Sequence, residues 1–172
     1  GWLSRRTGHF RRRLHHAERA ASELGVGFER HVPRDTATVR AVYARMQQVE
    51  QRSWKGLGHC GMAEPGSREF YEAMLLRLAS SGSGRVVFAR RGDEDVGFVF
   101  GGLTGSCYRG QQFSYVDGLA RYSIGNLLQQ EQLRWLGEEG VLRYDMGPRM
   151  DYKRHWTEIK TELHAWMLVP RA

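Results

Sequence analysis

The segment from Phe113 to Leu128 holds residue types suited to a phosphate-binding site. A predicted strand ends near Val116, and a predicted helix begins directly after a short loop that carries Arg121, Ser123 and Gly125. The start of a helix presents unpaired backbone N–H groups and a positive dipole end, and both favour a phosphate or pyrophosphate. Arginine can pair with phosphate charge, and glycine lets a ligand approach the backbone closely. The alternative interpretation is an ordinary strand-to-helix turn in which Ser123 is the N-cap.

Hydrophobic periodicity predicts the elements that position this loop. Apolar residues at helical spacing predict helices over residues 4–24, from Asp35 or Thr36 toward Lys55, from residue 67 onward and over residues 123–139. Alternating apolar and polar residues predict strands at 27–32, 85–90, 96–103, 111–116, 141–146 and 162–169, with a short helical piece at 151–156. Three of these strands are consecutive and joined by turns at 91–93 and 105–110, which predicts an antiparallel meander. The order indicates one α/β domain over residues 1–172 around a mixed sheet, which could be part of a longer protein.

Composition excludes several classes of protein. The 172 residues are 41% hydrophobic and 26% charged, which is typical of a globular domain, and no apolar run approaches the ~20 residues of a membrane span. Cys60 and Cys107 lie far apart without a CxxC spacing, which predicts reduced thiols in a cytoplasmic protein. The seven histidines lack metal-ligand spacing, so no metal site is expected.

The net charge of +7 is concentrated near the beginning of the chain. Residues 1–19 carry six arginines against one acid, Glu18, which is a local balance of +5. An anionic partner is one interpretation of this balance. The other is that heavy arginine use reflects genome composition, because all but three of the 26 basic residues are arginines.

Four separated motifs, in this order along the chain, resemble one family. They are the arginine-rich opening, Glu50-x-x-Ser53-Trp54-Lys55-Gly56, Tyr122-Ser123-Ile124-Gly125, and Asp145-x-Gly147 followed by Tyr152-Lys153 and Trp156. Together with the order of elements they resemble the Gcn5-related N-acetyltransferase (GNAT) superfamily, in its CelD-like acyltransferase branch related to Fem-type aminoacyltransferases. Two positions depart from that branch: Ile124 replaces a proline, and Val116-Asp117 stands where the family tends to have Asp-Pro.

The resemblance implies a fold and an activity. The fold would be α/β and GNAT-like, with a mixed central sheet that contains an antiparallel meander and is flanked by helices. The activity would be N-acyl transfer, with acetyl-CoA or another acyl-CoA as co-substrate and a small-molecule or peptide amine attacking directly. The residues that would hold coenzyme A are Tyr115, Val116, Arg121, Tyr122, Ser123, Ile124, Gly125, Asn126 and Lys153, of which Lys153 could equally face solvent.

Three residues could move protons in such a reaction, and each has a structural alternative. Tyr152 would lie near the thioester sulfur and could protonate the leaving thiolate, or simply pack in an amphipathic turn. Asp145 is predicted at the carboxyl end of a strand and could receive the amine's proton, or cap the turn at Gly147. Glu131 falls within the apolar stripe of its predicted helix. A buried glutamate there could be a base with a raised pKa or form a salt bridge to an arginine.

The acceptor side and the donor remain open to more than one interpretation. Glu50, Trp54 and Lys55 end a predicted helix that would face the acceptor cleft and could shape it, whereas Trp54 could instead be wedged in the core. The donor could be an acyl-carrier protein or an aminoacyl-tRNA that the basic N-terminal helix grips electrostatically. A catalytically silent domain that binds through the same cleft is a third reading, because fold alone does not establish activity. The sequence assigns no oligomeric state.

Overall fold

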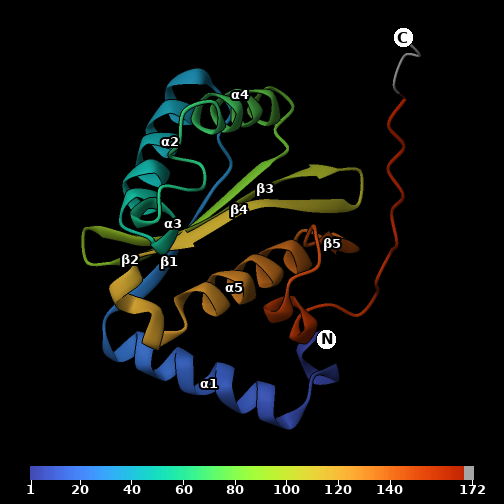
Figure 1. Cartoon of the computed structure of the whole chain (residues 1–172). Helices are drawn as coiled ribbons and strands as arrows, with labels where there is room; N and C mark the ends of the chain where they lie inside the picture. The colour runs from blue at the N-terminus through green and yellow to red at the C-terminus, as the bar shows by residue number, and fades with distance from the viewer. Residues whose placement is uncertain (169–172) are drawn as a thin grey trace.

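The computed structural model describes residues 1–168 and builds them around a five-stranded sheet with helices on both faces (Figure 1). The sheet consists of β1 (Val26–His31), β2 (Gly84–Arg91), β3 (Glu94–Thr104), β4 (Cys107–Tyr115) and β5 (Arg143–Asp145). The α-helices are α1 (Gly8–Glu23), α2 (Thr36–Gln51), α3 (Trp54–Leu57), α4 (Ser67–Ser80) and α5 (Ile124–Glu138). Three 3-10 turns complete the chain, η1 (Leu3–Arg5), η2 (Asp117–Tyr122) and η3 (Asp151–His155).

The strands lie in their sequence order, β1-β2-β3-β4-β5. β1 to β4 are antiparallel to one another, and only the last pair, β4 with β5, is parallel. This confirms the predicted α/β fold with a mixed sheet and an antiparallel meander. None of the described helices is long and apolar enough to cross a membrane.

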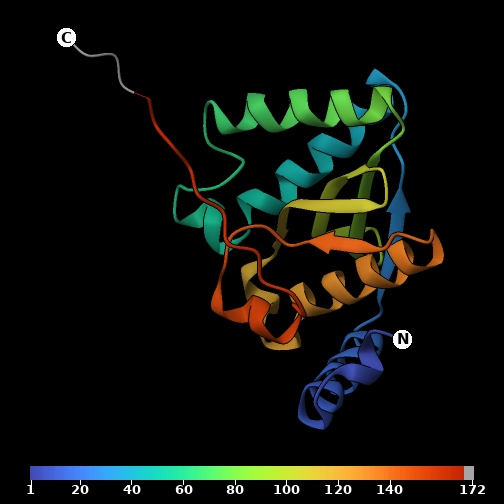
Figure 2. The same ribbon diagram turned by 90° about the vertical axis from the view of Figure 1, so that its right-hand side faces the viewer.

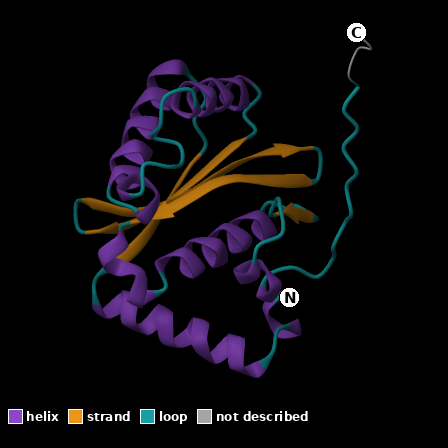
Figure 3. Cartoon of the chain, viewed as in Figure 1, coloured by secondary structure: helices purple, strands orange, loops and turns teal. Residues whose placement is uncertain are grey.

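The helices form two layers, one on each face of the sheet (Figures 1–3). α2 and α4 cover one face, where Met46, Phe88 and Phe98 are among the side chains that exclude solvent. α5 and α1 cover the other face, where Val99 and Leu128 lie in a second apolar cluster. Strand residues alternate between these clusters, because successive side chains point to opposite faces of a sheet. The sheet is therefore buried on both sides.

Capping side chains decide where several helices begin. Thr7 accepts a hydrogen bond from Phe10 N at 3.3 Å, so α1 begins at Gly8 and the helix predicted over 4–24 is shorter, with a separate 3-10 turn before it. Asp35, rather than Thr36, caps α2 by accepting from Thr38 N at 2.8 Å. Ser53 caps the next helix, so the helix predicted to run on toward Lys55 is broken into α2 and α3.

The last predicted strand, 162–169, is wrong for the residues that the structure describes. Residues 162–168 have no regular structure, and the extended segment after η3 leads away from the sheet (Figure 3). The Trp166 side chain is 91% exposed. Alternation forms a strand only when another strand supplies hydrogen-bond partners, and no strand pairs with this segment within residues 1–168. Val169 lies outside the described residues.

Smaller differences concern element ends. β4 begins at Cys107, so the predicted turn at 105–110 shrinks to the residues around Gly105, whose φ is +56°. β5 covers only 143–145 of the predicted 141–146. The helical piece predicted at 151–156 is the 3-10 turn η3. The ends of β4 and β5 are set by pairing across the sheet, which local sequence patterns do not contain.

Candidate active site

β4 loses its neighbour β5 after three residue pairs. The parallel ladder joins Cys107–Arg109 to Arg143–Asp145, whereas β4 itself continues to Tyr115. Beyond Arg109 no strand lies beside that edge of β4 among residues 1–168. We call residues 110–115 the open half of β4. An opening at this end of a strand gives a ligand access to backbone groups that are paired elsewhere in the sheet.

A bulge lies at the beginning of the open half. Phe100 of β3 pairs with Gln112, but the next residue, Gly101, pairs with Gly110, so Gln111 has no partner in the ladder. A bulge of this kind bends the strand and re-aims the side chains that follow it. The side chains after Gln111 therefore point in directions that differ from those of a regular continuation of β4.

Side chains of the open half alternate between the two helical layers. Gln112 and Ser114 point toward α2 and α3, where they hydrogen bond to side chains of those helices. Phe113 and Tyr115 point to the other face, where both rings lie against Gly125 at the start of α5. One strand thus separates two chemically different sides: polar toward α2 and α3, and aromatic toward α5.

The start of α5 leaves two backbone amides unpaired. Ser123 adopts the left-handed conformation, with φ 56°, and its side chain makes no capping hydrogen bond. The N–H groups of Ile124 and Gly125 donate to no acceptor within residues 1–168. The serine therefore precedes the helix without capping it. The two amides lie at the positive end of the helix dipole, where an anion is stabilised.

Gly125 brings α5 into direct contact with the open half of β4. A Cβ atom at this position would lie 2.8 Å from the ring of Tyr115 and 3.1 Å from that of Phe113. Any larger residue would have to displace these rings or the helix. The glycine is thus required by close packing between helix and strand, besides any approach of a ligand.

The other residues predicted to hold the donor lie around this helix start. The Arg121 side chain is exposed, with its guanidinium 4.8 Å from the ring centroid of Tyr122. Asn126 accepts a hydrogen bond from the Trp156 indole at 3.3 Å, which ties α5 to η3. Val116 donates its N–H to Val96 at 3.0 Å, so its amide is used within the sheet.

Tyr152 lies against the aromatic side of the open half. Its ring centroid is 5.7 Å from that of Phe113, with the planes tilted by 60°. Burial raises the pKa of the Tyr152 hydroxyl to about 12. The phenol is therefore protonated at neutral pH and can donate a proton or a hydrogen bond.

Asp145, the last residue of β5, holds the turn that follows this strand. Its carboxylate accepts from Gly147 N at 2.8 Å and pairs with Arg109. Burial acts in the opposite direction, but this hydrogen bond and the Arg109 charge hold the pKa of Asp145 below its usual value. Burial raises the pKa of Tyr144, and the proximity of Tyr152 and of Asp145 raises it further. Tyr152 and Asp145 thus both lie near Tyr144.

Glu131 is not part of this group. It is buried on α5, and its carboxylate lies 2.7 Å from Arg30 of β1 and 2.7 Å from Arg134. β1 is the edge strand opposite to β5. Glu131 therefore takes part in structural ion pairs near the opposite edge of the sheet.

Lys153 is buried and its ammonium points into the protein. It donates to the backbone oxygens of Met146 and Pro148, at 2.7 and 2.9 Å. Burial lowers its pKa, and the charge of Arg109 lowers it further, against a smaller opposite effect of Asp145. These bonds tie η3, which carries Tyr152, to the segment between β5 and η3.

The Glu-x-x-Ser-Trp-Lys-Gly motif forms one buried polar cluster beside the open half. Glu50 is 0% exposed and accepts hydrogen bonds from Ser114 and from Met62 N, while its Oε1 lies 3.3 Å from Lys55 Nζ. Ser53 turns the chain by accepting from Gly56 N at 3.3 Å. A Cβ atom on Gly56 would lie 2.3 Å from the Glu50 carbonyl oxygen, so only glycine fits there.

Trp54 is the member of this motif that faces outward. Its side chain is 57% exposed, and the neighbouring exposed apolar residues on α3 and α4 are Leu57 and Phe70. The alternative of a tryptophan wedged in the core does not describe this side chain. Of the three residues predicted to shape the acceptor side, Glu50 and Lys55 are thus internal and Trp54 is accessible.

A family model described as an acetyltransferase (GNAT) domain matches residues 8–154 of the chain. The chain belongs to the GNAT acetyltransferase family. None of the curated proteins matches it by sequence. Because the match spans all five strands and reaches η3, both sides of the open half of β4 lie within the GNAT domain.

Solved structures support the same fold at low sequence identity. A GNAT family acetyltransferase from Staphylococcus aureus is 5% identical, with 83% of this chain and 99% of that chain covered and a TM-score of 0.54. An aminoglycoside acetyltransferase from an uncultured soil metagenomic sample, in complex with sisomicin, is 13% identical over 85% and 98%, with a TM-score of 0.58. AAC(6')-Iy in complex with the bisubstrate analog CoA-S-monomethyl-acetylneamine is 9% identical over 84% and 98%, with a TM-score of 0.55.

Sequence reasoning missed several residues that surround the open half of this GNAT domain. Tyr71 and Gln112 form a hydrogen bond of 2.6 Å on the polar side. Phe113 is the surface on which Tyr152 packs, and Arg109 is the partner of Asp145. No spacing rule connects these pairs, although the position of Gln112 and Phe113 just before the glycine-containing loop is a signal that could have drawn attention to them.

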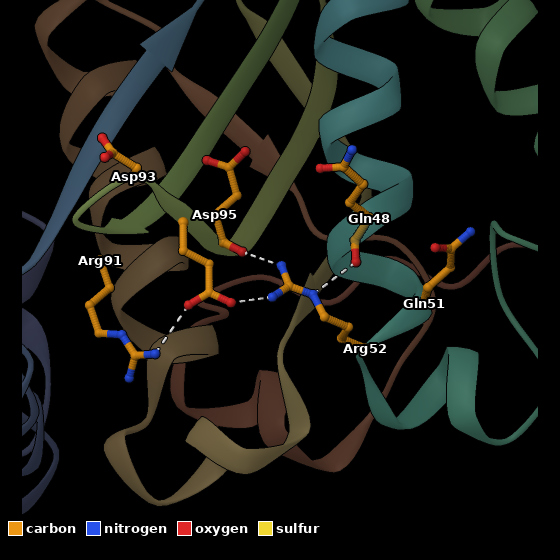
Figure 4. Close-up of a pocket in the computed structure, with 7 residues that line it drawn as sticks. Gln48, Gln51, Arg52, Arg91, Asp93 and Asp95 are labelled. Carbon is orange, nitrogen blue, oxygen red and sulfur yellow. Dashed lines mark hydrogen bonds and ion pairs between the residues drawn. The ribbon is translucent and has the colours of Figure 1, made fainter.

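A hollow lies elsewhere in the GNAT domain, at the end of α2 and the turn between β2 and β3 (Figure 4). Arg52 crosses it, bonding to the backbone oxygens of Gln48 and Asp95 and pairing with Glu94, which also pairs with Arg91. The hollow has a volume of about 660 Å³ and is open to solvent. Its charged groups are mostly paired with one another, and the bonds of Arg52 join α2 to the turn between β2 and β3.

Proposed function

We propose that this GNAT domain is an N-acyltransferase that moves an acyl group, acetyl in the simplest case, from coenzyme A to an amine by direct attack. The observation that carries the proposal is the pair of unpaired amides at Ile124 and Gly125, which lie beside the open half of β4. The co-substrate is suggested also by the fold neighbour AAC(6')-Iy, whose structure holds a CoA-based bisubstrate analog. A pyrophosphate matches the charge that such a helix start stabilises.

The residues near the helix start fit a coenzyme A donor. The pyrophosphate would accept hydrogen bonds from the amides of Ile124 and Gly125, with the exposed Arg121 available for a further phosphate. The acyl arm would extend along the aromatic side of the open half, past Tyr115 and Phe113 toward Tyr152. Asn126 and Lys153 would support this site by fixing η3 and the segment before it.

The proposed reaction needs a proton for the sulfur. The neutral amine attacks the thioester carbonyl, a C–N bond forms, and the C–S bond breaks to release a thiolate. Tyr152 donates its proton to that thiolate, the extra proton of the attacking nitrogen leaves to solvent, and the Tyr152 phenolate then takes a proton back from solvent. A phenol whose pKa is raised to about 12 is protonated at neutral pH, as a general acid must be.

We assign supporting roles to the other two candidates for proton transfer. A carboxylate with a lowered pKa is a poor base, so Asp145 would orient the turn that precedes Tyr152. Glu131 would stabilise the packing of α5 against β1 through its ion pairs. We also propose that the protein belongs to the CelD-like branch of the family. The Glu-x-x-Ser-Trp-Lys-Gly motif of that branch forms one hydrogen-bonded cluster here, which supports this assignment. A cytoplasmic location is proposed because both cysteines are free thiols.

Ligand-induced stabilisation tests the donor. The melting temperature should rise with acetyl-CoA and with free CoA, since a ligand at 100 times its Kd adds about 2.7 kcal/mol to stability. Longer acyl-CoAs in the same series report the acyl length. No shift with any of these ligands would contradict the proposal, and binding without acyl transfer to any amine would indicate a silent domain.

A second candidate function has one specific observation in its favour. Arg11, Arg12, Arg13 and Arg19 of α1 are all exposed, and none of them forms an ion pair within the described chain. An unpaired cluster of guanidinium groups attracts a polyanion. The donor would then be carried by an acyl-carrier protein or a tRNA, with the same open half of β4 as the site of transfer.

A further inference from the structure

The polar side of the open half contains a chain of hydrogen bonds that the proposed reaction does not yet use. It begins at the buried Glu50, passes through Lys55 and Gln112, and ends at the hydroxyl of Tyr71 on α4. The residues come from α2, α3, β4 and α4, so these hydrogen bonds connect three helices to β4 on the face of the sheet opposite to α5. Its outer end, Tyr71, is only partly buried.

Lys55 fixes the direction of this chain. Its Nζ lies 3.3 Å from Glu50 Oε1, 3.0 Å from Gln112 Oε1 and 2.9 Å from the Phe113 carbonyl oxygen. An ammonium group has three N–H donors and no acceptor, so all three partners must accept. The Gln112 side chain consequently turns its oxygen to Lys55 and its NH₂ group in the other direction.

The orientation of Gln112 in turn decides what the Tyr71 hydroxyl can do. Gln112 Nε2 lies 2.6 Å from Tyr71 Oη, and an amide NH₂ group only donates. The phenol oxygen therefore accepts from Gln112, and its own proton must point elsewhere. Within residues 1–168 that O–H donates to no group. Tyr71 is thus an oriented donor whose proton has no acceptor among the described residues.

Aromatic packing holds the Tyr71 ring in place. Its centroid lies 5.9 Å from that of Phe100 at 88°, and 5.2 Å from that of Phe70 at 74°. The ring cannot turn away from Gln112 without losing both contacts. A hydroxyl with a fixed ring and a fixed proton direction, on a side chain that is only partly buried, has the properties of a substrate-recognition group.

We infer that Tyr71 determines acceptor specificity: its hydroxyl donates a hydrogen bond to an oxygen atom of the amine substrate. Lys55 and Gln112 are positioning residues that set the direction of the Tyr71 proton. The favoured substrates are amines that carry a carbonyl, carboxylate or other accepting oxygen, in preference to plain alkyl or aryl amines. This inference rests on the proposed function, because it places the amine on the polar side of β4 and the acyl donor on the aromatic side, so that the two meet at the edge of β4 that β5 leaves open.

A matched pair of amines tests the inference. Phenylalanine amide and 2-phenylethylamine share an aromatic ring and an amine, and only the first has a carbonyl oxygen. The wild-type protein should favour phenylalanine amide in kcat/KM, and Tyr71→Phe should lower that preference by roughly fivefold, the value of one net hydrogen bond. Tyr108→Phe, which removes a hydroxyl from the paired half of β4, is the control and should leave the preference unchanged.

A second variant reverses the direction of the hydrogen bond between Gln112 and Tyr71 and keeps the shape of the side chain at position 112. Gln112→Glu keeps the acceptor for Lys55 but presents a carboxylate to Tyr71, so the phenol proton turns inward and the substrate loses its donor. Gln112→Glu should therefore lose the preference for phenylalanine amide as Tyr71→Phe does, although the Tyr71 hydroxyl is still present. A purely structural role of Tyr71 would leave the preference in Gln112→Glu as in the wild type.

Saturation-transfer NMR with the same two amines separates this inference from the proposed function. If no acetyl transfer occurs but the NMR preference for phenylalanine amide disappears in Tyr71→Phe, the proposed function fails and the recognition role of Tyr71 holds. If CoA binds and acetyl transfer occurs, yet Tyr71→Phe keeps the wild-type preference, the inference is overturned and the proposed function stands. The absence of a preference in both assays of the wild type also overturns it.

Discussion

The ring of Tyr152 packs on the ring of Phe113, with centroids 5.7 Å apart. Phe113 belongs to the open half of β4, and Tyr152 belongs to the 3-10 turn that follows β5. The two aromatic side chains thus connect β4 to the segment after β5, beyond the point where the two strands stop pairing and on the side where the donor loop lies. This contact places the hydroxyl of a protonated phenol next to the proposed path of the acyl arm.

Tyr152→Phe should separate catalysis from binding. The substitution removes one hydroxyl and keeps the ring on Phe113, so CoA affinity measured by calorimetry should hold. If Tyr152 is the general acid, kcat should fall by roughly 10² to 10⁴. A variant with wild-type kcat would show that the thiolate leaves without Tyr152.

The pH dependence of the wild type follows from the pKa of Tyr152, which burial raises to about 12. A phenol that binds its proton more tightly when folded stabilises the fold fully below its ordinary pKa, and this contribution is lost as the pH rises from about 10 to 12. The acid form persists throughout the assay range, so kcat should show no alkaline fall below pH 10. A fall between pH 8 and 9 would point to a different group.

Two glycines of α5 should respond in opposite directions to alanine. Gly125→Ala places a methyl group 2.8 Å from Tyr115 and should destabilise the protein by about 1–3 kcal/mol while weakening CoA binding. A Cβ on Gly137 meets nothing within 4 Å, so Gly137→Ala should stabilise by about 0.5–1 kcal/mol and leave CoA affinity unchanged. Urea denaturation and calorimetry measure both. Equal effects at the two positions would contradict the contact between α5 and β4.

Glu50→Gln should be strongly destabilising because it leaves the buried Lys55 ammonium without a charged partner. Breaking a buried pair costs about 3–5 kcal/mol. Burial already lowers the pKa of Lys55 in the wild type, and the loss of Glu50 should lower it further. The unfolded state then binds more protons, so stability of the variant should recover as the pH rises from 7 to 10.

Asp151→Asn is the control for the Glu50 variant. It removes a carboxylate that pairs with Arg154 at the surface, and its effect on the free energy of unfolding should be small at every pH. A similar small effect of Glu50→Gln would mean that solvent reaches the cluster around Lys55.

Replacing Arg11, Arg12 and Arg13 by glutamine tests the carrier-bound donor. Binding of acyl-carrier protein or of tRNA should weaken, and the salt dependence of binding should become less steep, because three cations are lost. Acetyl transfer from free acetyl-CoA should hardly change. The matched control replaces Arg34, Arg40 and Arg77, which are exposed and outside α1. Equal effects of the two triple variants would exclude α1 as the docking surface.

Local sequence patterns determined the elements of this protein and much of the donor loop. Periods of two and of about 3.6 predicted the meander strands and α5 with small errors at the ends, because these periods arise from the backbone geometry itself. The cap at Asp35 was one of the two predicted, whereas those at Thr7 and Ser53 were not, although all three act within three residues along the chain. Prediction failed for 162–168, where the pattern was typical of a strand but no strand among residues 1–168 pairs with it.

Only the tertiary structure decided which side chains act together. Glu131 and Arg30 are 101 residues apart in sequence, and Tyr71 and Gln112 are 41 apart. The fold directs Glu131 to one edge of the sheet and Tyr152 with Asp145 to the other, although all three were equal candidates by residue type. It also buries Lys55 and exposes Trp54, its neighbour in the chain. Hydrogen bonding and burial depend on packing between distant segments, and neither spacing nor composition records which segments will meet.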